Sequence, residues 1–186
     1  MKRIKNFRLF ESDYELPDYE LPDEVKERLQ DDGEGNYLFY HFSTEERDVI
    51  KPGTGQNILT SREEGAALSS VNGLAMYYIN PSNRETNMGF WRHVVKIPKE
   101  KVYYFNTDAL NFYDEALERF RKIYDGKERP MLAFNPNYQL AWLTKVAVEK
   151  GFQMVIAIWG RRDDGLRAQT TLKLKPFEAK RSIYGD

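Results

Sequence analysis

The residues best suited to ligand chemistry are a histidine and a tyrosine pair on two aromatic-rich segments. His41 lies in the phrase Tyr40-His41-Phe42-Ser43, and Tyr77 and Tyr78 end an apolar run that begins at Gly73. An imidazole supplies hydrogen bonds and a phenol ring supplies a stacking face, so two such strands can line a cleft that holds a nucleotide. We therefore take His41 and Tyr77 as the candidate ligand face.

These residues also have plain structural interpretations. A single histidine among aromatic residues is often a hydrogen-bonded core residue. Tyr77 and Tyr78 must point to opposite faces of a strand, so one belongs to the core and the other is exposed or lines a cleft. Tyr78 shares a face with Met76, which favours Tyr77 for the cleft. Ser61 either contacts a ribose or, with Glu64 three residues later, caps a helix.

Composition limits the classes of partner. The chain has 186 residues, 41% hydrophobic and 14% aromatic, which suits one domain with a core rich in rings. Its net charge of −1 provides no overall field that would attract nucleic acid or an anionic membrane. Cations do gather in the last quarter, and they form either a local basic patch or a solvated face: Arg161, Arg162, Arg167, Lys173, Lys175, Lys180 and Arg181.

The rarest residue types exclude several kinds of site. There is no cysteine, which excludes a disulfide scaffold, a thiol nucleophile and thiolate metal ligation. With only two histidines, a multi-histidine zinc site is also excluded, and we expect no metal. No apolar run approaches the length of a membrane span, and the first ten residues lack the apolar core of a secretory signal. We expect a cytoplasmic protein that is neither secreted nor membrane-bound.

Residues 1–35 differ from the rest of the chain. Asp13-Tyr14-Glu15-Leu16-Pro17 is repeated immediately as Asp18-Tyr19-Glu20-Leu21-Pro22, and the prolines oppose both helix and central strand. We expect an acidic, extended arm that lies along a partner or along the surface of the domain. Asp23 is expected to cap a short helix to about Gln30, and a single globular domain should occupy residues 36–186.

The periodicity of that domain favours α+β, with a mainly antiparallel, split β-sheet and a few flanking helices. Strand patterns occur at 37–43, 74–79, 91–97, 102–105, 153–159 and 169–175. Helix patterns run from Ser61 to about Val71, from Thr107 or Asp108 to Gly126, and from Pro136 to Gly151.

In this order, the segments resemble the ADP-ribosyltransferase fold in its histidine–tyrosine branch, which includes polymerase-type and DNA-modifying transferases. Tyr40-His41-Phe42-Ser43 is similar to the opening strand of that family, and the segment from Gly73 to Tyr78 is similar to its second key strand. Residues 94–105 and the stretch from Lys150 onward resemble later strands. The resemblance covers about residues 37–184 and rests on the order of the segments and on short sequence motifs.

The resemblance implies NAD as a substrate and a protein or nucleic acid as the target. It places His41 on the adenosine ribose, the rings of Tyr77 and Tyr78 at the nicotinamide, and Ser61 near a ribose. The family's last strand carries a glutamate that stabilises the developing cation. Here Gln169 takes that catalytic position without a charge. Three interpretations stay open: a slow or altered transferase, nucleotide binding without turnover, or a likeness of fold alone.

The N-terminal leader suggests a different class of function. Residues 4–12 resemble the short leaders of proteins packaged in tailed-phage virions. The alternative is therefore a non-enzymatic phage virion or interaction protein that contacts a virion or host protein through residues 1–30. The two ideas are compatible, because phages carry transferases into host cells.

Overall fold

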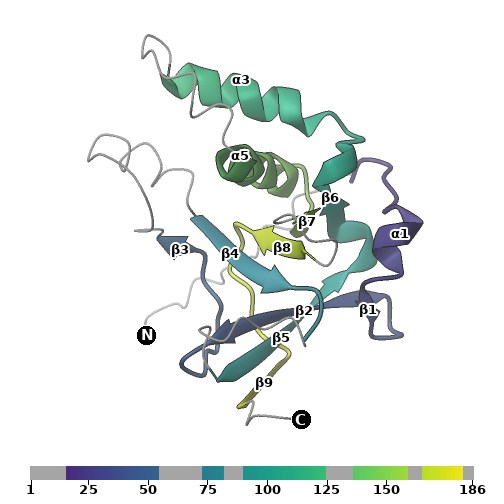
Figure 1. Ribbon diagram of the computed structural model, residues 1–186, viewed down its shortest axis with the longest axis vertical. Coiled ribbons are helices and arrows are strands. Elements are labelled where there is room, and N and C mark those ends of the chain that lie inside the picture. Colours follow the sequence, from purple (N-terminus) through teal and green to yellow (C-terminus); the bar gives the residue numbers. More distant parts are fainter. Residues whose placement is uncertain (1–15, 55–72, 82–89, 125–135, 159–164, 182–186) are drawn as a thin grey trace, which may run out of the picture.

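The structure, a computed structural model, describes residues 16–54, 73–81, 90–124, 136–158 and 165–181 (Figure 1). It is α+β, with an open and mostly antiparallel sheet whose strands run in the order β6-β7-β8-β4-β2-β5-β9. β1 pairs with β2 and β3 pairs with β4 outside this path. The strands are β1 (Gln30–Asp31), β2 (Asn36–Ser43), β3 (Gly53–Thr54), β4 (Gly73–Tyr78), β5 (Trp91–Pro98), β6 (Val102–Tyr104), β7 (Met154–Ile158), β8 (Leu166–Thr170) and β9 (Glu178–Arg181).

The helices are concentrated at the β6-β7-β8 end, where α3 and α5 lie above the sheet (Figure 1). α3 begins at Phe112, later than the expected start at Thr107 or Asp108. The Asp108 carboxylate accepts hydrogen bonds from the first amides of the helix, those of Phe112 and Tyr113, at 3.0 and 2.9 Å. No helix in the described ranges is long and apolar enough to cross a membrane. The helical elements are α1 (Asp23–Lys26), η1 (Lys99–Lys101), η2 (Phe105–Thr107), α3 (Phe112–Tyr124) and α5 (Pro136–Glu149).

The sheet divides between β2 and β4. β2 pairs with β5 along its whole length, but with β4 only at Tyr40 and Tyr78. The beginning of β4 pairs instead with β3, at Gly53 and Thr54. We call the gap between these two pairings the fork. The mainly antiparallel sheet is thus confirmed, with the parallel β6–β7 pair as an exception.

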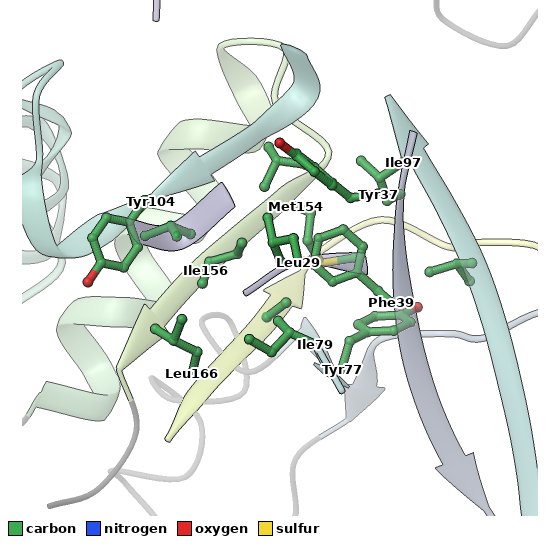
Figure 2. Packing of buried hydrophobic residues seen from close by; sticks show 14 of the residues in the cluster. Leu29, Tyr37, Phe39, Tyr77, Ile79, Ile97, Tyr104, Met154, Ile156 and Leu166 are labelled. Carbon is green, nitrogen blue, oxygen red and sulfur yellow. The ribbon is translucent and has the colours of Figure 1, made fainter. Parts of the chain in front are cut away.

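Each face of the sheet has its own core. Tyr37, Phe39, Tyr77 and Ile97 belong to the cluster on one face, which we call the fork face, and Figure 2 shows Phe39 and Tyr77 close together there. The opposite face, which we call the helix face, packs Val155 and Ala157 of β7 against α3 and α5. Because side chains alternate along a strand, neighbouring residues of one strand point to opposite faces of the sheet.

Residues before position 36 contribute to both the core and the sheet. Leu21, Val25 and Leu29 are buried in the core of the fork face, and β1 extends the sheet. Tyr19 packs on Tyr103 with ring centroids 4.9 Å apart. The core of the fork face therefore includes residues before position 36, the expected start of the domain: Leu21 of the repeat, Val25 of α1 and Leu29 after that helix.

Several other boundaries also differ from expectation. The last predicted strand, 169–175, is displaced: β8 ends at Thr170, and an isolated bridge between Ile50 and Leu174 precedes β9. α1 is shorter than expected, and Asp23 is its first residue and not its cap. The predicted helix from Ser61 lies outside the described residues.

Candidate functional site

His41 occupies the fork. Just past the Tyr40–Tyr78 pair, β2 diverges from β4, and the carbonyl of Met76 has His41 Nδ1 2.9 Å away. A carbonyl can only accept, so Nδ1 carries the proton and donates it. The imidazole thus satisfies a strand carbonyl where the backbone ladder has ended.

This bond defines what His41 presents to a ligand. With Nδ1 protonated in the neutral ring, Nε2 is an acceptor, and among the described residues it has no hydrogen bond. Burial lowers the pKa of His41, and the nearby His93 and Arg47 lower it further, although the bond to Met76 opposes them. The ring is half-buried, so a neutral Nε2 is available near pH 7.

Tyr77 lies beside this histidine on the fork face. The two ring centroids are 5.6 Å apart at an interplanar angle of 53°. Tyr77 is fully buried, and no described residue bonds to its hydroxyl. Burial raises the pKa of this phenol, so it remains a protonated potential donor. A buried hydroxyl without a partner costs free energy. Within the part of the chain that the structure describes, the fork therefore holds one unpaired polar group, the Tyr77 hydroxyl.

His93 completes the group, and sequence reasoning did not single it out. It pairs with His41 across β2 and β5 and is fully buried. Its Nε2 accepts from the amide of Arg47 at 2.9 Å, and its Nδ1 donates to the carbonyl of His41 at 3.3 Å. His93 therefore ties the loop after β2 to the sheet. The signal available in the sequence was that His93 is a polar residue at an inward-facing position of the predicted strand 91–97.

Gln169 and Tyr78 lie on the other face. Gln169 pairs with Met76 and Val155, is 1% exposed, and donates to the hydroxyl of Thr144 on α5 at 2.6 Å. Tyr78 pairs with Arg167, whose guanidinium carbon lies 4.3 Å from the ring centroid. The structure thus brings His41 and Tyr77 together but does not bring Gln169 or Tyr78 to them.

The remaining expectations concern Ser61 and metal binding. Ser61 lies outside the described residues. In the ranges that are described, no cluster of three or more histidine, cysteine, aspartate or glutamate residues could hold a metal ion. Comparison of the chain with protein-family models, with curated proteins and with solved structures gives no match.

Proposed function

We propose that this chain binds NAD or a related ADP-ribose nucleotide at the fork, as a domain of ADP-ribosyltransferase type. The observation that carries the proposal is the pair formed by His41 and Tyr77. One offers an unused acceptor, Nε2, and the other a buried hydroxyl to which no described residue bonds. Ribose hydroxyls can donate to the first and accept from the second.

The two proposed contacts, through His41 Nε2 and through the Tyr77 hydroxyl, differ in how accessible they are to a ligand. His41 is half-buried, whereas Tyr77 is fully buried. A nucleotide can therefore reach Nε2 directly, and it reaches the tyrosine hydroxyl only after a covering side chain moves. Ile50 and Leu174 pack in or against the same core cluster as Tyr77 and are candidates for that movement.

The position of Gln169 favours binding without turnover through this residue. Cleavage of the nicotinamide bond needs stabilisation of positive charge on the ribose, which an uncharged amide does not supply. The side chain also points toward α5, where it bonds to Thr144. In this proposal Gln169 is a structural residue, and any transfer of ADP-ribose to a protein or nucleic acid would use other groups.

The test is calorimetric titration with NAD and with ADP-ribose, using two isosteric variants. His41→Asn keeps an amide donor near the position of Nδ1 but removes Nε2. His41→Gln places an amide oxygen near Nε2 but removes the donor to Met76. We expect His41→Asn to fold normally and bind about tenfold more weakly, and His41→Gln to lose stability but retain more affinity.

Nicotinamide release should be measured on the same samples. Release by the wild type would restore the transferase interpretation with chemistry at another residue. No heat and no release at millimolar NAD from the folded wild type would refute the proposal. Equal affinity of wild type and His41→Asn would locate the nucleotide elsewhere.

The second candidate is a non-enzymatic virion or interaction protein of a phage, acting in the host cytoplasm or in the virion. The structural role of Gln169 favours it. A deletion test must stop before Leu16, because Leu21, Val25 and Leu29 are core residues. Removing residues 1–15 should abolish association with a virion or host protein and leave NAD binding unchanged. Retained association after this deletion would rule out the leader as the contact.

A further inference from the structure

We propose that residues 171–181, which we call the basic strip, bind the backbone of a single-stranded nucleic acid, with Phe177 as a stacking platform. This inference goes beyond the nucleotide at the fork and depends on different residues. The basic strip runs from the end of β8, in the middle of the molecule, to the end of β9, which lies at the opposite end from α3 (Figure 1).

The charge of the basic strip is concentrated and exposed. It contains four cations and one carboxylate in a chain whose net charge is −1. The carboxylate, Glu178, pairs with Lys180. Among the described residues, Lys173, Lys175 and Arg181 have no ion-pair partner, and all three side chains are exposed. A local field of this kind attracts phosphates even when the whole protein is nearly neutral.

The isolated bridge orients the lysines. Ile50 and Leu174 exchange backbone hydrogen bonds of 2.8 and 3.0 Å, and both side chains pack into the core of the fork face. Because side chains alternate along extended chain, Lys173 and Lys175 point outward together. Antiparallel pairing at the bridge also places Lys51 opposite Lys173, and Lys51 is exposed. Three ammonium groups thus share one side of this bridge.

Phe177 follows these lysines in the chain and adds an aromatic surface to the basic strip. It is 65% exposed, and its amide is anchored by a 2.8 Å hydrogen bond to the carbonyl of Val94. The ammonium of Lys96 lies 4.2 Å from the ring centroid, which fixes the ring without covering most of the residue. Farther along, Arg181 pairs with Trp91. Alternating cations and rings suit a single strand, whose phosphates meet the cations and whose bases stack on the rings.

Other anionic partners match this surface less well. A membrane would need several apolar side chains to insert, and within the basic strip only Phe177 is both large and strongly exposed. An acidic protein would engage the lysines but would have no specific use for the exposed ring. The combination therefore favours a nucleic acid, and the ring is the feature that distinguishes it.

The experiment is fluorescence anisotropy with labelled, mixed-sequence DNA and RNA single strands of about twelve nucleotides, between about 50 and 200 mM salt. Lys173→Ala/Lys175→Ala should weaken binding and reduce the slope of log affinity against log salt by about 1.4. Phe177→Ala should weaken binding roughly tenfold and leave the slope unchanged. Arg28→Ala/Lys122→Ala removes the same charge from exposed sites on other elements and should match the wild type in slope.

Four outcomes would overturn the proposal. They are no binding at the lower salt, equal loss in the control variant, full competition by polyglutamate with no effect of Phe177→Ala, or Phe177-dependent binding to phosphatidylserine vesicles in place of oligonucleotides. His41→Asn should leave oligonucleotide affinity at the wild-type value. Failure of the fork site and failure of the basic strip are thereby distinguishable.

Discussion

The two adjacent tyrosines of β4, Tyr77 and Tyr78, point to opposite faces of the sheet and have different surroundings. On the helix face, the guanidinium of Arg167 lies over the ring of Tyr78. The ring of Tyr78 also packs against Phe42, with the two ring centroids 5.5 Å apart. On the fork face, Tyr77 is equally buried, yet its hydroxyl has no partner among the described residues. The adjacent tyrosines thus differ in their surroundings: the ring of Tyr78 contacts a cation and a second ring, whereas the buried hydroxyl of Tyr77 has no described partner.

The same contrast separates the two polar residues suggested by the sequence. Gln169 donates to Thr144 inside the helix face, whereas His41 uses one nitrogen on Met76 and leaves Nε2 available. Buried polar groups that pair with each other hold elements together, and groups left unpaired are the ones a ligand can satisfy. The indole N–H of Trp142, in the core of the helix face, also has no partner among the described residues. The comparison therefore concerns Gln169 and His41 alone: it favours a structural role for the first and agrees with the proposed binding by the second.

The most severe test places a charge on the helix face. Gln169→Glu buries a carboxylate beside Thr144, and we expect it to lower the free energy of unfolding at pH 7 by more than about 3 kcal/mol. Burial raises the pKa of such a carboxylate, so the loss should shrink as the pH falls and the group becomes neutral. Urea denaturation at pH 7 and pH 5 measures both effects.

A neutral control separates charge from packing. Gln169→Met keeps a similar volume and loses one hydrogen bond, so about 1–2 kcal/mol is expected at either pH. The assignment of a structural role to Gln169 fails if Gln169→Glu is as stable as the wild type. It fails more decisively if that variant gains nicotinamide release, because Gln169 would then stand at a reaction centre.

The sequence predicted elements better than their contacts. Strands such as 91–97 were recognised from their aromatic and β-branched residues, and α5 from its proline start and Gly151, which has a φ of +102°. The burial of Leu21 and the place of Gln169 were not predictable in this way. Both depend on which face of a strand or segment meets distant parts of the chain, and local patterns carry little information about that.

A pH titration sharpens the account of the fork. Burial lowers the pKa of both His41 and His93, so near pH 6 the unfolded chain binds more protons than the folded chain. Stability should be constant above about pH 7 and fall as the pH drops below about 6.5, the unfolded-state pKa. Each histidine that takes up a proton only on unfolding adds a slope of about 1.4 kcal/mol per pH unit.

The chain offers a complete control, because it contains only two histidines. His41→Asn and His93→Asn each keep an amide donor near the position of Nδ1 and should each remove part of the slope. The double variant should show a flat profile between about pH 5.5 and 7.5, above the range of ordinary carboxylates. A slope that persists in the double variant would mean that other groups titrate on unfolding.

The smallest expected effect compares two buried tyrosine hydroxyls. Tyr103 donates to Asp108 at 2.8 Å, so Tyr103→Phe should cost about 1 kcal/mol in urea denaturation. Tyr77→Phe removes a hydroxyl to which no described residue bonds, so stability should stay the same or rise by up to about 1 kcal/mol. Equal losses in both variants would show that the Tyr77 hydroxyl already has a partner. A stable Tyr77→Phe variant with weakened NAD affinity would instead mean that the fold leaves this hydroxyl unsatisfied and that the nucleotide bonds to it.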